Sequence, residues 1–355
     1  MLVITDGDSE VLFTVHQGLA LITLNRPRAI NALTHAMVLQ IDKALAGWAS
    51  DAHIRAVMIR GAGDRGLCAG GDLRPMYADA TTGGTAAFTF WADEYRLNAR
   101  IARYPKPYIA IMDGLVMGGG VGLSAHGSVR VVTERSRIGM PEVGIGLFPD
   151  VGGTYLLSRA PGQLGLHVAL TGAPISAADA LLCGLADSYV PSDYLGDLFR
   201  ALQEEAPGTA IASHAVTPPA SQLQGQRAWI DQCYDADSVE EILARLEAYG
   251  GEAALAASVI QQKSPTSLKV TLRAIRSAER MPNLETVLDQ EYRLARASLH
   301  AHDLAEGIRA QIIEKDRNPR WFPATLAEVT DEAVDAYFAP LGDAELGLAS
   351  GANRA

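Results

Sequence analysis

Residues 107–122 read PYIAIMDGLVMGGGVG, an apolar run followed by a loop with three consecutive glycines. The run has the length of a buried strand, and glycine lets a backbone turn sharply or approach a ligand closely. Upstream, residues 54–59 (IRAVMI) form a second apolar run, which leads into a glycine-rich loop over 61–71. In α/β folds, loops that follow the carboxyl ends of strands carry the ligand sites.

The flanking segments continue an alternation of strands and helices. Residues 11–15 and 19–24 predict a hairpin at the edge of a sheet, with Gln17-Gly18 at its turn. A helix is expected over 86–102 and another strand over 129–133. This alternation predicts an α/β fold with largely parallel strands.

The composition changes near residues 204–226, where Pro, Ser, Ala, Gly and Thr dominate, and helical periodicity follows. We therefore expect a core with the ligand site over 1–205, a linker over 206–230 and a helical region over 231–350.

Composition restricts the partners and the compartment. The chain has 355 residues and a formal charge of −11, which argues against a nucleic-acid partner. No apolar run is long enough to cross a bilayer, so no membrane partner is expected. The widely spaced Cys68, Cys183 and Cys233 indicate a reducing compartment, and no metal-ligand spacing is present. The N-terminal residues resemble neither a signal nor a transit peptide, so we expect a cytoplasmic location.

Two motifs are misleading. Residues 61–66 match the dinucleotide pattern Gly-x-Gly-x-x-Gly, but more loop follows them instead of the helix that would hold a pyrophosphate. Ser124 resembles a hydrolase nucleophile, but the next glycine comes three residues later instead of two. We expect Ser124 to be a buried helix residue.

The two glycine loops are more informative. Ala69-Gly70-Gly71-Asp72 and Met117-Gly118-Gly119-Gly120 each follow a strand and lead into a helix. Each can therefore present unpaired backbone amides, and two such loops could direct two N–H groups at one carbonyl oxygen, forming an oxyanion hole. Tight turns for helix–sheet packing are an equally good interpretation of the spacing.

Two carboxylates lie in mostly apolar segments, Glu142 in MPEVG (140–144) and Asp150 in LFPDVGG (147–153). In a shared pocket, burial and mutual repulsion would raise the pKa of at least one of them, as a catalytic base or nucleophile near neutral pH requires. A solvated loop charge, or a helix N-cap for Asp150, remains the alternative.

These residues resemble the crotonase (enoyl-CoA hydratase/isomerase) superfamily. The motifs that match are Leu24-Asn25-Arg26-Pro27, Asn31-Ala32-Leu33, Leu67-Cys68-Ala69-Gly70-Gly71-Asp72-Leu73, Met117-Gly118-Gly119-Gly120 and Met140-Pro141-Glu142. The resemblance implies a ClpP/crotonase-type α/β fold of stacked β-β-α units with a helical C-terminal region. It also implies that the amides of Gly71 and Gly119 form the oxyanion hole. Relatives often form trimers or hexamers, so a homo-oligomer is one alternative; the other is that the helical C-terminal region covers the surface used for assembly.

Departures from the hydratase pattern indicate which branch of the superfamily the chain resembles. A hydratase would carry a catalytic Glu at the position of Gly122, whereas this chain adds Asp150 and Glu94. This set resembles the 3-hydroxyisobutyryl-CoA hydrolase branch, which implies a thioester hydrolase of valine catabolism acting on a short hydroxyacyl-CoA. CoA would be part of the substrate, and no cofactor is implied. An enoyl-CoA hydratase/isomerase, a non-catalytic CoA-binding protein and a nucleotide-dependent oxidoreductase are the alternatives.

The resemblance also implies roles for side chains. Glu142 would attack the thioester carbonyl or activate water, Asp150 would bind the substrate hydroxyl or relay a proton, and Glu94 would close the acyl pocket. The candidates for contacts with CoA are the side chains of Arg26, Arg28 and Lys315 and the backbone groups of Ala69 and Asp72. For the two arginines and the lysine, a solvated surface charge is an equally good interpretation.

Overall fold

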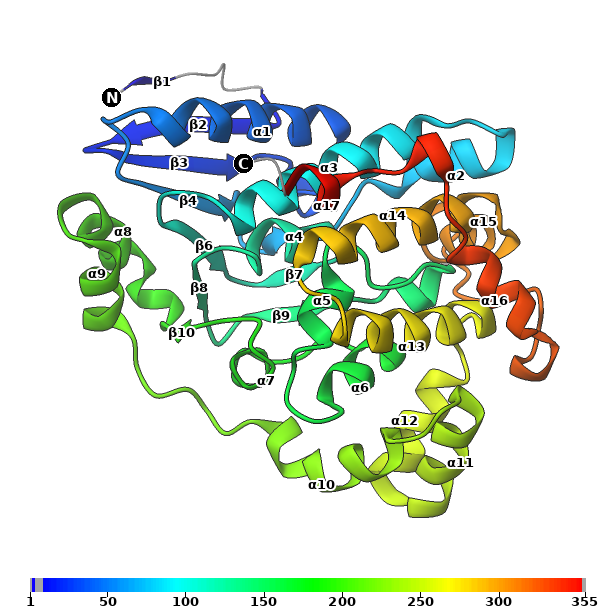
Figure 1. Ribbon diagram of the computed structural model, residues 1–355. Helices are drawn as coiled ribbons and strands as arrows, with labels where there is room; N and C mark the ends of the chain where they lie inside the picture. The colour runs from blue at the N-terminus through cyan, green and yellow to red at the C-terminus, as the bar shows by residue number, and fades with distance from the viewer. Residues whose placement is uncertain (1, 4–8, 353–355) are drawn as a thin grey trace. The chain divides into compact units, whose positions relative to one another are not determined.

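The computed structural model (Figure 1) describes residues 2–3 and 9–352. These residues divide into two compact units. Unit 1 consists of the described residues within 1–71, 96–139 and 175–222. Unit 2 consists of those within 72–95, 140–174 and 223–355. Both units are therefore assembled from separate stretches of the chain.

All strands in the described residues belong to unit 1. A seven-stranded sheet has the order β1-β2-β3-β4-β6-β8-β10, and a three-stranded sheet has the order β5-β7-β9. The strands are β1 (Leu2–Val3), β2 (Val11–His16), β3 (Leu19–Leu24), β4 (Ala56–Gly61), β5 (Gly66–Cys68), β6 (Tyr108–Met112), β7 (Leu115–Met117), β8 (Val129–Val132), β9 (Arg137–Gly139) and β10 (Ser188–Tyr189).

The larger sheet combines an antiparallel edge with a parallel centre. β2 and β3 pair as the predicted hairpin, and Gln17 and Gly18 at its turn have φ values of 48° and 79°. Two left-handed residues are what a two-residue hairpin turn requires. From β3 onward the pairs β3–β4, β4–β6 and β6–β8 are parallel. The β6 residues are all buried, as expected for a central parallel strand.

Each central strand of the larger sheet is followed by a strand of the smaller one, β4 by β5, β6 by β7 and β8 by β9. The β6-β7 pair then leads into α4 (Gly119–Ser124). The predicted α/β class with stacked β-β-α units is confirmed. The other complete helices of unit 1 are α1 (His35–Ser50), α7 (Ala177–Leu182), α8 (Leu195–Glu204) and α9 (Pro207–His214).

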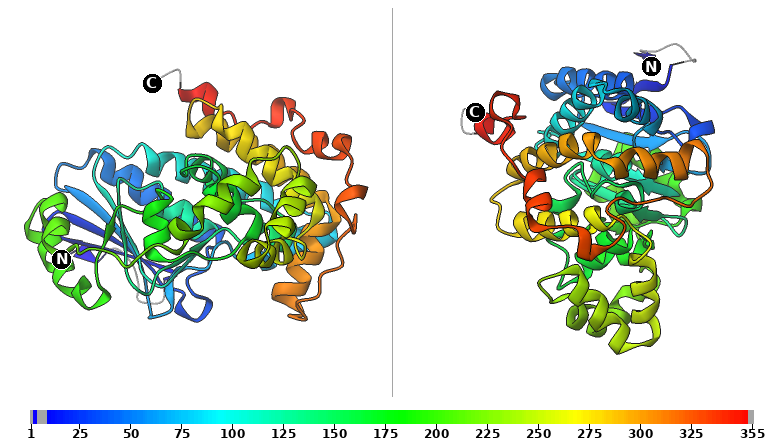
Figure 2. Two further views of the ribbon diagram at one scale, coloured as in Figure 1. Left: turned by 90° about the horizontal axis from the view of Figure 1, so that it is seen from below. Right: turned by 90° about the vertical axis from the view of Figure 1, so that its right-hand side faces the viewer.

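Unit 2 is helical in its described residues. α11 and α12 pack against each other, and Figure 2 shows them as adjacent yellow-green helices. Its main elements are α2 (Leu73–Thr82), the first part of α3 (Ala86–Ala102), the 3-10 helix η2 (Glu142–Ile145), α5 (Gly153–Leu157), α6 (Leu164–Thr171), α10 (Gln222–Tyr234), α11 (Val239–Tyr249), α12 (Gly251–Ile260), α13 (Pro265–Glu279), α14 (Leu284–His300), α15 (His302–Ile308), α16 (Asp331–Tyr337) and α17 (Leu348–Ala352). Residues 206–230, expected as a linker, contain α9 and the start of α10. Among the described helices, none combines the length and apolarity that a membrane span requires.

Candidate active site

Two glycine loops leave neighbouring strands of the small sheet in unit 1. β5 ends at Cys68 and β7 ends at Met117, and these two strands pair in parallel. The loops that follow them therefore lie at the same edge of the sheet. Gly119 is the first residue of α4, so its amide has no acceptor within that helix.

The backbones of the two loops approach closely enough to require glycine. Gly70 has a φ of +102°, and a Cβ atom there would lie 3.3 Å from the Met117 carbonyl oxygen and 3.7 Å from the Gly119 nitrogen. A Cβ on Gly120 would lie 2.7 Å from the Cys68 carbonyl oxygen. In the loops and turns of the described chain, neither Gly71 nor Gly119 donates its amide to a backbone carbonyl. Two adjacent loops thus carry amides that are available to a ligand.

Four of the buried carboxyl groups in unit 2 form one cluster, in which burial and the other three groups raise the pKa of Glu142. Glu94 lies on α3, Glu142 begins η2, Asp150 lies in the loop before α5, and Glu291 lies on α14. Each of these residues is at most 5% exposed. An ionised carboxylate in such a place costs on the order of several kcal/mol unless it is protonated or hydrogen-bonded. A concentration of buried acids is therefore a strong indication of a functional site.

The four groups change one another's proton affinity. Burial, and then the charge of Asp150, raises the pKa of both Glu94 and Glu142 well above the ordinary value of 4.5. Burial raises the pKa of Asp150 to about 6, against the lowering effect of a hydrogen bond from Tyr95. Burial also raises the pKa of Glu291 to about 8. Near neutral pH the cluster therefore shares protons among its members, as acid–base chemistry requires.

Two oxygen atoms of the cluster have no partner in the described protein. They are Oε1 of Glu94 and Oε2 of Glu142, and both are buried. Asp150, in contrast, accepts a hydrogen bond of 2.8 Å from the Tyr95 hydroxyl. An unsatisfied buried acceptor costs about 1–3 kcal/mol, which a ligand that brings a donor would recover. Glu94 and Glu142 are thus prepared to receive a polar ligand.

The structure does not support the N-cap interpretation of Asp150. α5 begins at Gly153 and its N-cap is Gly152, so Asp150 precedes the helix by more than a cap position. Its carboxylate is bonded to a tyrosine hydroxyl and not to the helix amides. Asp150 is held in the interior of unit 2, in the same cluster as Glu142 and Glu94.

The misleading motifs have structural explanations. The 61–66 loop leads into strand β5, and the Asn31 side chain donates to the carbonyl oxygens of Ala62 at 3.0 Å and Gly66 at 3.1 Å. This loop is a connection between sheets and lacks the helix that a dinucleotide site needs. Ser124 is fully buried in α4 and donates to the Gly120 carbonyl at 2.6 Å, as expected for a helix residue.

The candidates for CoA contacts in unit 1 already have structural partners or are exposed. Arg26 forms an ion pair of 3.0 Å with Glu10 and donates to the Ala32 carbonyl at 2.5 Å. Arg28 is exposed in the 3-10 helix Pro27–Ala29. The Ala69 amide donates to a carbonyl of the 27–33 segment at 2.9 Å.

The two other candidates belong to unit 2. Asp72 is the N-cap of α2 and accepts a hydrogen bond of 3.3 Å from the Arg74 amide. Lys315 is exposed and has a left-handed φ of 60°. The structure thus assigns Asp72 a capping function and leaves the Lys315 side chain on the surface. The described residues contain no His, Cys, Asp and Glu group that is arranged to hold a metal ion.

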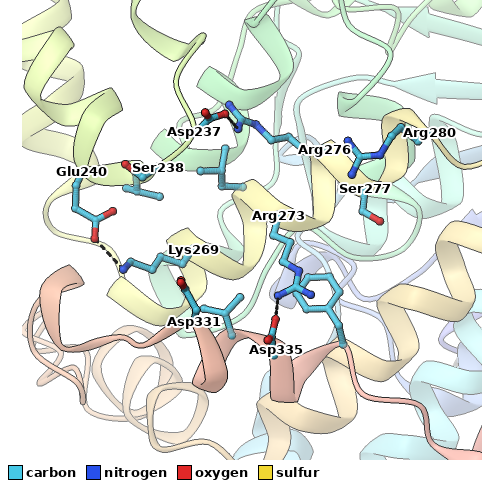
Figure 3. Close-up of a pocket in the computed structure, with 14 residues that line it drawn as sticks. Asp237, Ser238, Glu240, Lys269, Arg273, Arg276, Ser277, Arg280, Asp331 and Asp335 are labelled. Atoms are coloured by element: carbon cyan, nitrogen blue, oxygen red, sulfur yellow. Dashed lines mark hydrogen bonds and ion pairs between the residues drawn. The ribbon is translucent and has the colours of Figure 1, made fainter.

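A groove of about 750 Å³ runs along α13 in unit 2, lined also by residues of α11 and α16 (Figure 3). Three of its four basic side chains form ion pairs within the protein, and the fourth, Arg280, is balanced in number by the acidic residue Asp331. The ion pairs are Lys269–Glu240 (2.8 Å), Arg276–Asp237 (3.2 Å) and Arg273–Asp335. The groove therefore offers little net charge to a ligand and differs from the acidic cluster, which contains unsatisfied atoms.

Sequence reasoning missed Glu291 and Tyr95 as members of the cluster. A signal for Glu291 was present, because α14 buries Leu284, Val287, Leu288 and Leu294, and position 291 falls on the same helical face. An acid on the apolar face of an amphipathic helix is a candidate functional residue. Tyr95 carries no comparable signal, since a buried tyrosine is common in helix packing.

Solved structures share the fold of this chain. The chain superimposes with a TM-score of 0.93 on a carnitinyl-CoA dehydratase from Mycobacterium thermoresistibile, at 56% identity over 96% of this chain and 98% of the other. It superimposes with a TM-score of 0.90 on an enoyl-CoA hydratase from Rhodobacter sphaeroides, at 42% identity over 95% and 99% of the two chains. These matches confirm the crotonase-type fold expected from the sequence.

Curated relatives extend over nearly the whole chain. The mitochondrial 3-hydroxyisobutyryl-CoA hydrolases of Danio rerio and Homo sapiens are 42% and 39% identical to it, over 96% of this chain and 92% of each relative. Their names contradict the cytoplasmic location expected from the sequence, and that expectation is wrong. Widely spaced cysteines indicate a reducing compartment but do not distinguish one such compartment from another.

The profile of the enoyl-CoA hydratase/isomerase family matches residues 19–338, which include both glycine loops and all four acids of the cluster. Together with relatives of about 40% identity over most of the chain, this match establishes the family. The chain belongs to the enoyl-CoA hydratase/isomerase family.

Proposed function

We propose that this protein hydrolyses the thioester of 3-hydroxyisobutyryl-CoA or of a similar short hydroxyacyl-CoA, and so acts in valine degradation. The observation that carries the proposal is the buried acid cluster of Glu94, Glu142 and Asp150, with unsatisfied oxygen atoms on the two glutamates. The names of the curated relatives support the same substrate.

In the proposed mechanism the amides of Gly71 and Gly119 hold the thioester oxygen and stabilise the negative charge that develops on it. Each such donor contributes about 100- to 1,000-fold in rate. Glu142 either attacks the carbonyl carbon and expels the CoA thiolate, or removes a proton from the water that attacks. In both routes the carbon–sulfur bond breaks, a carbon–oxygen bond forms, and the thiolate takes up a proton and leaves as the thiol. In the nucleophilic route water then hydrolyses the anhydride between the acyl group and Glu142, which releases the acid and regenerates the carboxylate.

The other acids would select the substrate. Asp150 would bind the 3-hydroxyl group or relay a proton, and Glu94 would close the acyl pocket. Arg26, Arg28, Ala69, Asp72 and Lys315 remain the proposed contacts for CoA, which is a part of the substrate and makes a separate cofactor unnecessary. A homo-oligomer also remains part of the proposal.

A hydratase or dehydratase is the second candidate, because the two solved relatives carry those names. Adding or removing water at an enoyl thioester generally uses a pair of acid–base groups. Position 122 is a glycine in α4, so the second acid of the hydratase pattern is missing. This departure favours hydrolysis.

The proposal is tested by measuring free thiol released from 3-hydroxyisobutyryl-CoA. Glu142→Gln should reduce turnover by about 100-fold or more, since it removes a nucleophile or a general base. Glu247→Gln is the matched control, because this exposed glutamate on α11 accepts a bond of 2.7 Å from Gln261, away from the acid cluster. Its turnover should equal that of the wild type.

The second candidate is tested in the same samples by the loss of enoyl absorbance with crotonyl-CoA. If crotonyl-CoA is hydrated and no thiol is released, the protein is a hydratase and the proposed hydrolase function is wrong. Undiminished thiol release by Glu142→Gln would remove Glu142 from the mechanism.

A further inference from the structure

Glu291 supports the turn that follows Asp150. It is fully buried on α14, and its carboxylate accepts hydrogen bonds from the amides of Gly152 at 2.6 Å and Thr154 at 3.1 Å. The Thr154 hydroxyl donates to the same carboxylate at 2.5 Å. Three donors from one short segment thus converge on a single side chain that is distant in the sequence.

The supported turn has an unusual backbone. Val151 and Gly152 have φ values of 53° and 80°, so two consecutive residues are left-handed. This conformation is sterically unfavourable for a β-branched residue such as valine. Successive amides in a turn of this kind point toward one side and form a binding site for an anion. In this protein the carboxyl group of Glu291 occupies that site and accepts the amides of Gly152 and Thr154.

The turn lies directly beside a proposed catalytic group. Asp150 immediately precedes Val151, and its carbonyl oxygen accepts the Gly153 amide at 2.6 Å. The direction of the Asp150 side chain therefore depends on the turn that Glu291 stabilises. The charge of Glu291 also raises the pKa of Glu142, which means that the two carboxyl groups lie in one electrostatic environment.

We propose that Glu291 is a positioning residue, which holds the 151–154 turn in its strained form and so aims the Asp150 carboxylate at the substrate hydroxyl. The inference rests on the proposed function, because it assigns Asp150 to the hydroxyl group of the acyl chain. A glutamate that merely joined α14 to the loop would affect stability without affecting the choice of substrate.

The test is a double-mutant cycle of Glu291→Gln with Asp150→Asn, assayed with 3-hydroxyisobutyryl-CoA and with isobutyryl-CoA, which lacks the hydroxyl. Displacing a catalytic group by about 1 Å costs about 100-fold in rate. Glu291→Gln should therefore lower kcat/KM for the hydroxylated substrate by about 10- to 100-fold, and by much less for isobutyryl-CoA. In the Asp150→Asn background the same change should cost less than about threefold, because residues that act through each other are not additive.

Thr154→Val provides a second variant, because it removes one donor to Glu291 and leaves the carboxyl group itself in place. It should show a smaller loss with the same dependence on Asp150 and on the substrate hydroxyl. Ser298→Ala is the control in the same helix, since its buried hydroxyl donates to Leu294 at 2.8 Å within α14. It should change neither kcat/KM nor the ratio between the substrates.

The outcomes separate the inference from the function. Equal losses for both substrates, or losses that multiply with Asp150→Asn, would overturn the positioning role while hydrolysis by the wild type still stood. A wild-type protein that releases no thiol from either substrate would overturn the proposed function itself, and the positioning role with it.

Discussion

Replacing Asp150 by asparagine should lower kcat/KM for the hydroxyacyl substrate and yet stabilise the fold. The wild-type carboxylate is buried beside the acids of Glu94 and Glu142, whose pKa values it raises. Asparagine has nearly the same shape and keeps an oxygen that can accept the Tyr95 hydroxyl, which is bonded at 2.8 Å in the wild type. The substitution therefore removes a repulsive charge and preserves the packing.

The magnitude follows from the pKa of Asp150, which burial raises from 3.8 to about 6 in the folded protein. A difference of about 2 pKa units corresponds to about 3 kcal/mol, which is an upper limit for the gain. The folded state binds more protons than the unfolded state between these two pKa values, so the wild type loses stability as the pH rises from 4 to 6. Asparagine does not titrate, so its advantage should be largest above pH 6 and should shrink to less than about 1 kcal/mol near pH 4.

Urea unfolding of both proteins at several pH values measures this difference. We expect Asp150→Asn to be more stable by about 1–3 kcal/mol at pH 7.5. Asp303→Asn is the matched control, since this buried aspartate accepts bonds of 2.6 Å from Ser264 and 2.7 Å from the Phe322 amide. That control should be destabilised. Equal or lower stability of Asp150→Asn at pH 7.5 would refute the conclusion that burial makes ionised Asp150 unfavourable in the folded protein.

Two further changes test the packing around the site and the groove. Gly120→Ala should destabilise the fold by about 1–3 kcal/mol in thermal unfolding, because its Cβ would lie 2.7 Å from the Cys68 carbonyl oxygen. Gly225→Ala in α10 is the control, since a Cβ there meets no atom within 4 Å, and it should be neutral or stabilising. Arg273→Gln should lower the free energy of unfolding by at most about 1 kcal/mol, and by less at high salt, because its ion pair with Asp335 is largely exposed. Urea unfolding at low and high salt measures this, and a large loss of stability that is insensitive to salt would contradict it.

The sequence predicts the parts of the site that depend on local pattern. Glycine loops after apolar strands predict the edge where Gly71 and Gly119 occur, because parallel neighbours end on the same side of a sheet. Glu142 and Asp150 stand out as acids in apolar segments. Glu291 enters the cluster through the packing of α14, which comes about 140 residues later, and no local pattern states which loop that helix will meet. The interleaved units are unpredictable for the same reason, since composition reports only on neighbours along the chain.

The dependence of the Asp150 turn on Glu291 has a consequence for biosynthesis. Gly152 and Glu291 are separated by 139 positions, so a ribosome that adds about 5–20 residues per second takes roughly 7 to 28 s to supply the acceptor after the turn has been made. During that interval the donors of the turn can bond only to water or to temporary partners, and the left-handed valine has nothing to hold it. The acids of the cluster therefore reach their final geometry late in translation, and a nascent chain that stops before α14 would have most of its sequence but an incomplete cluster.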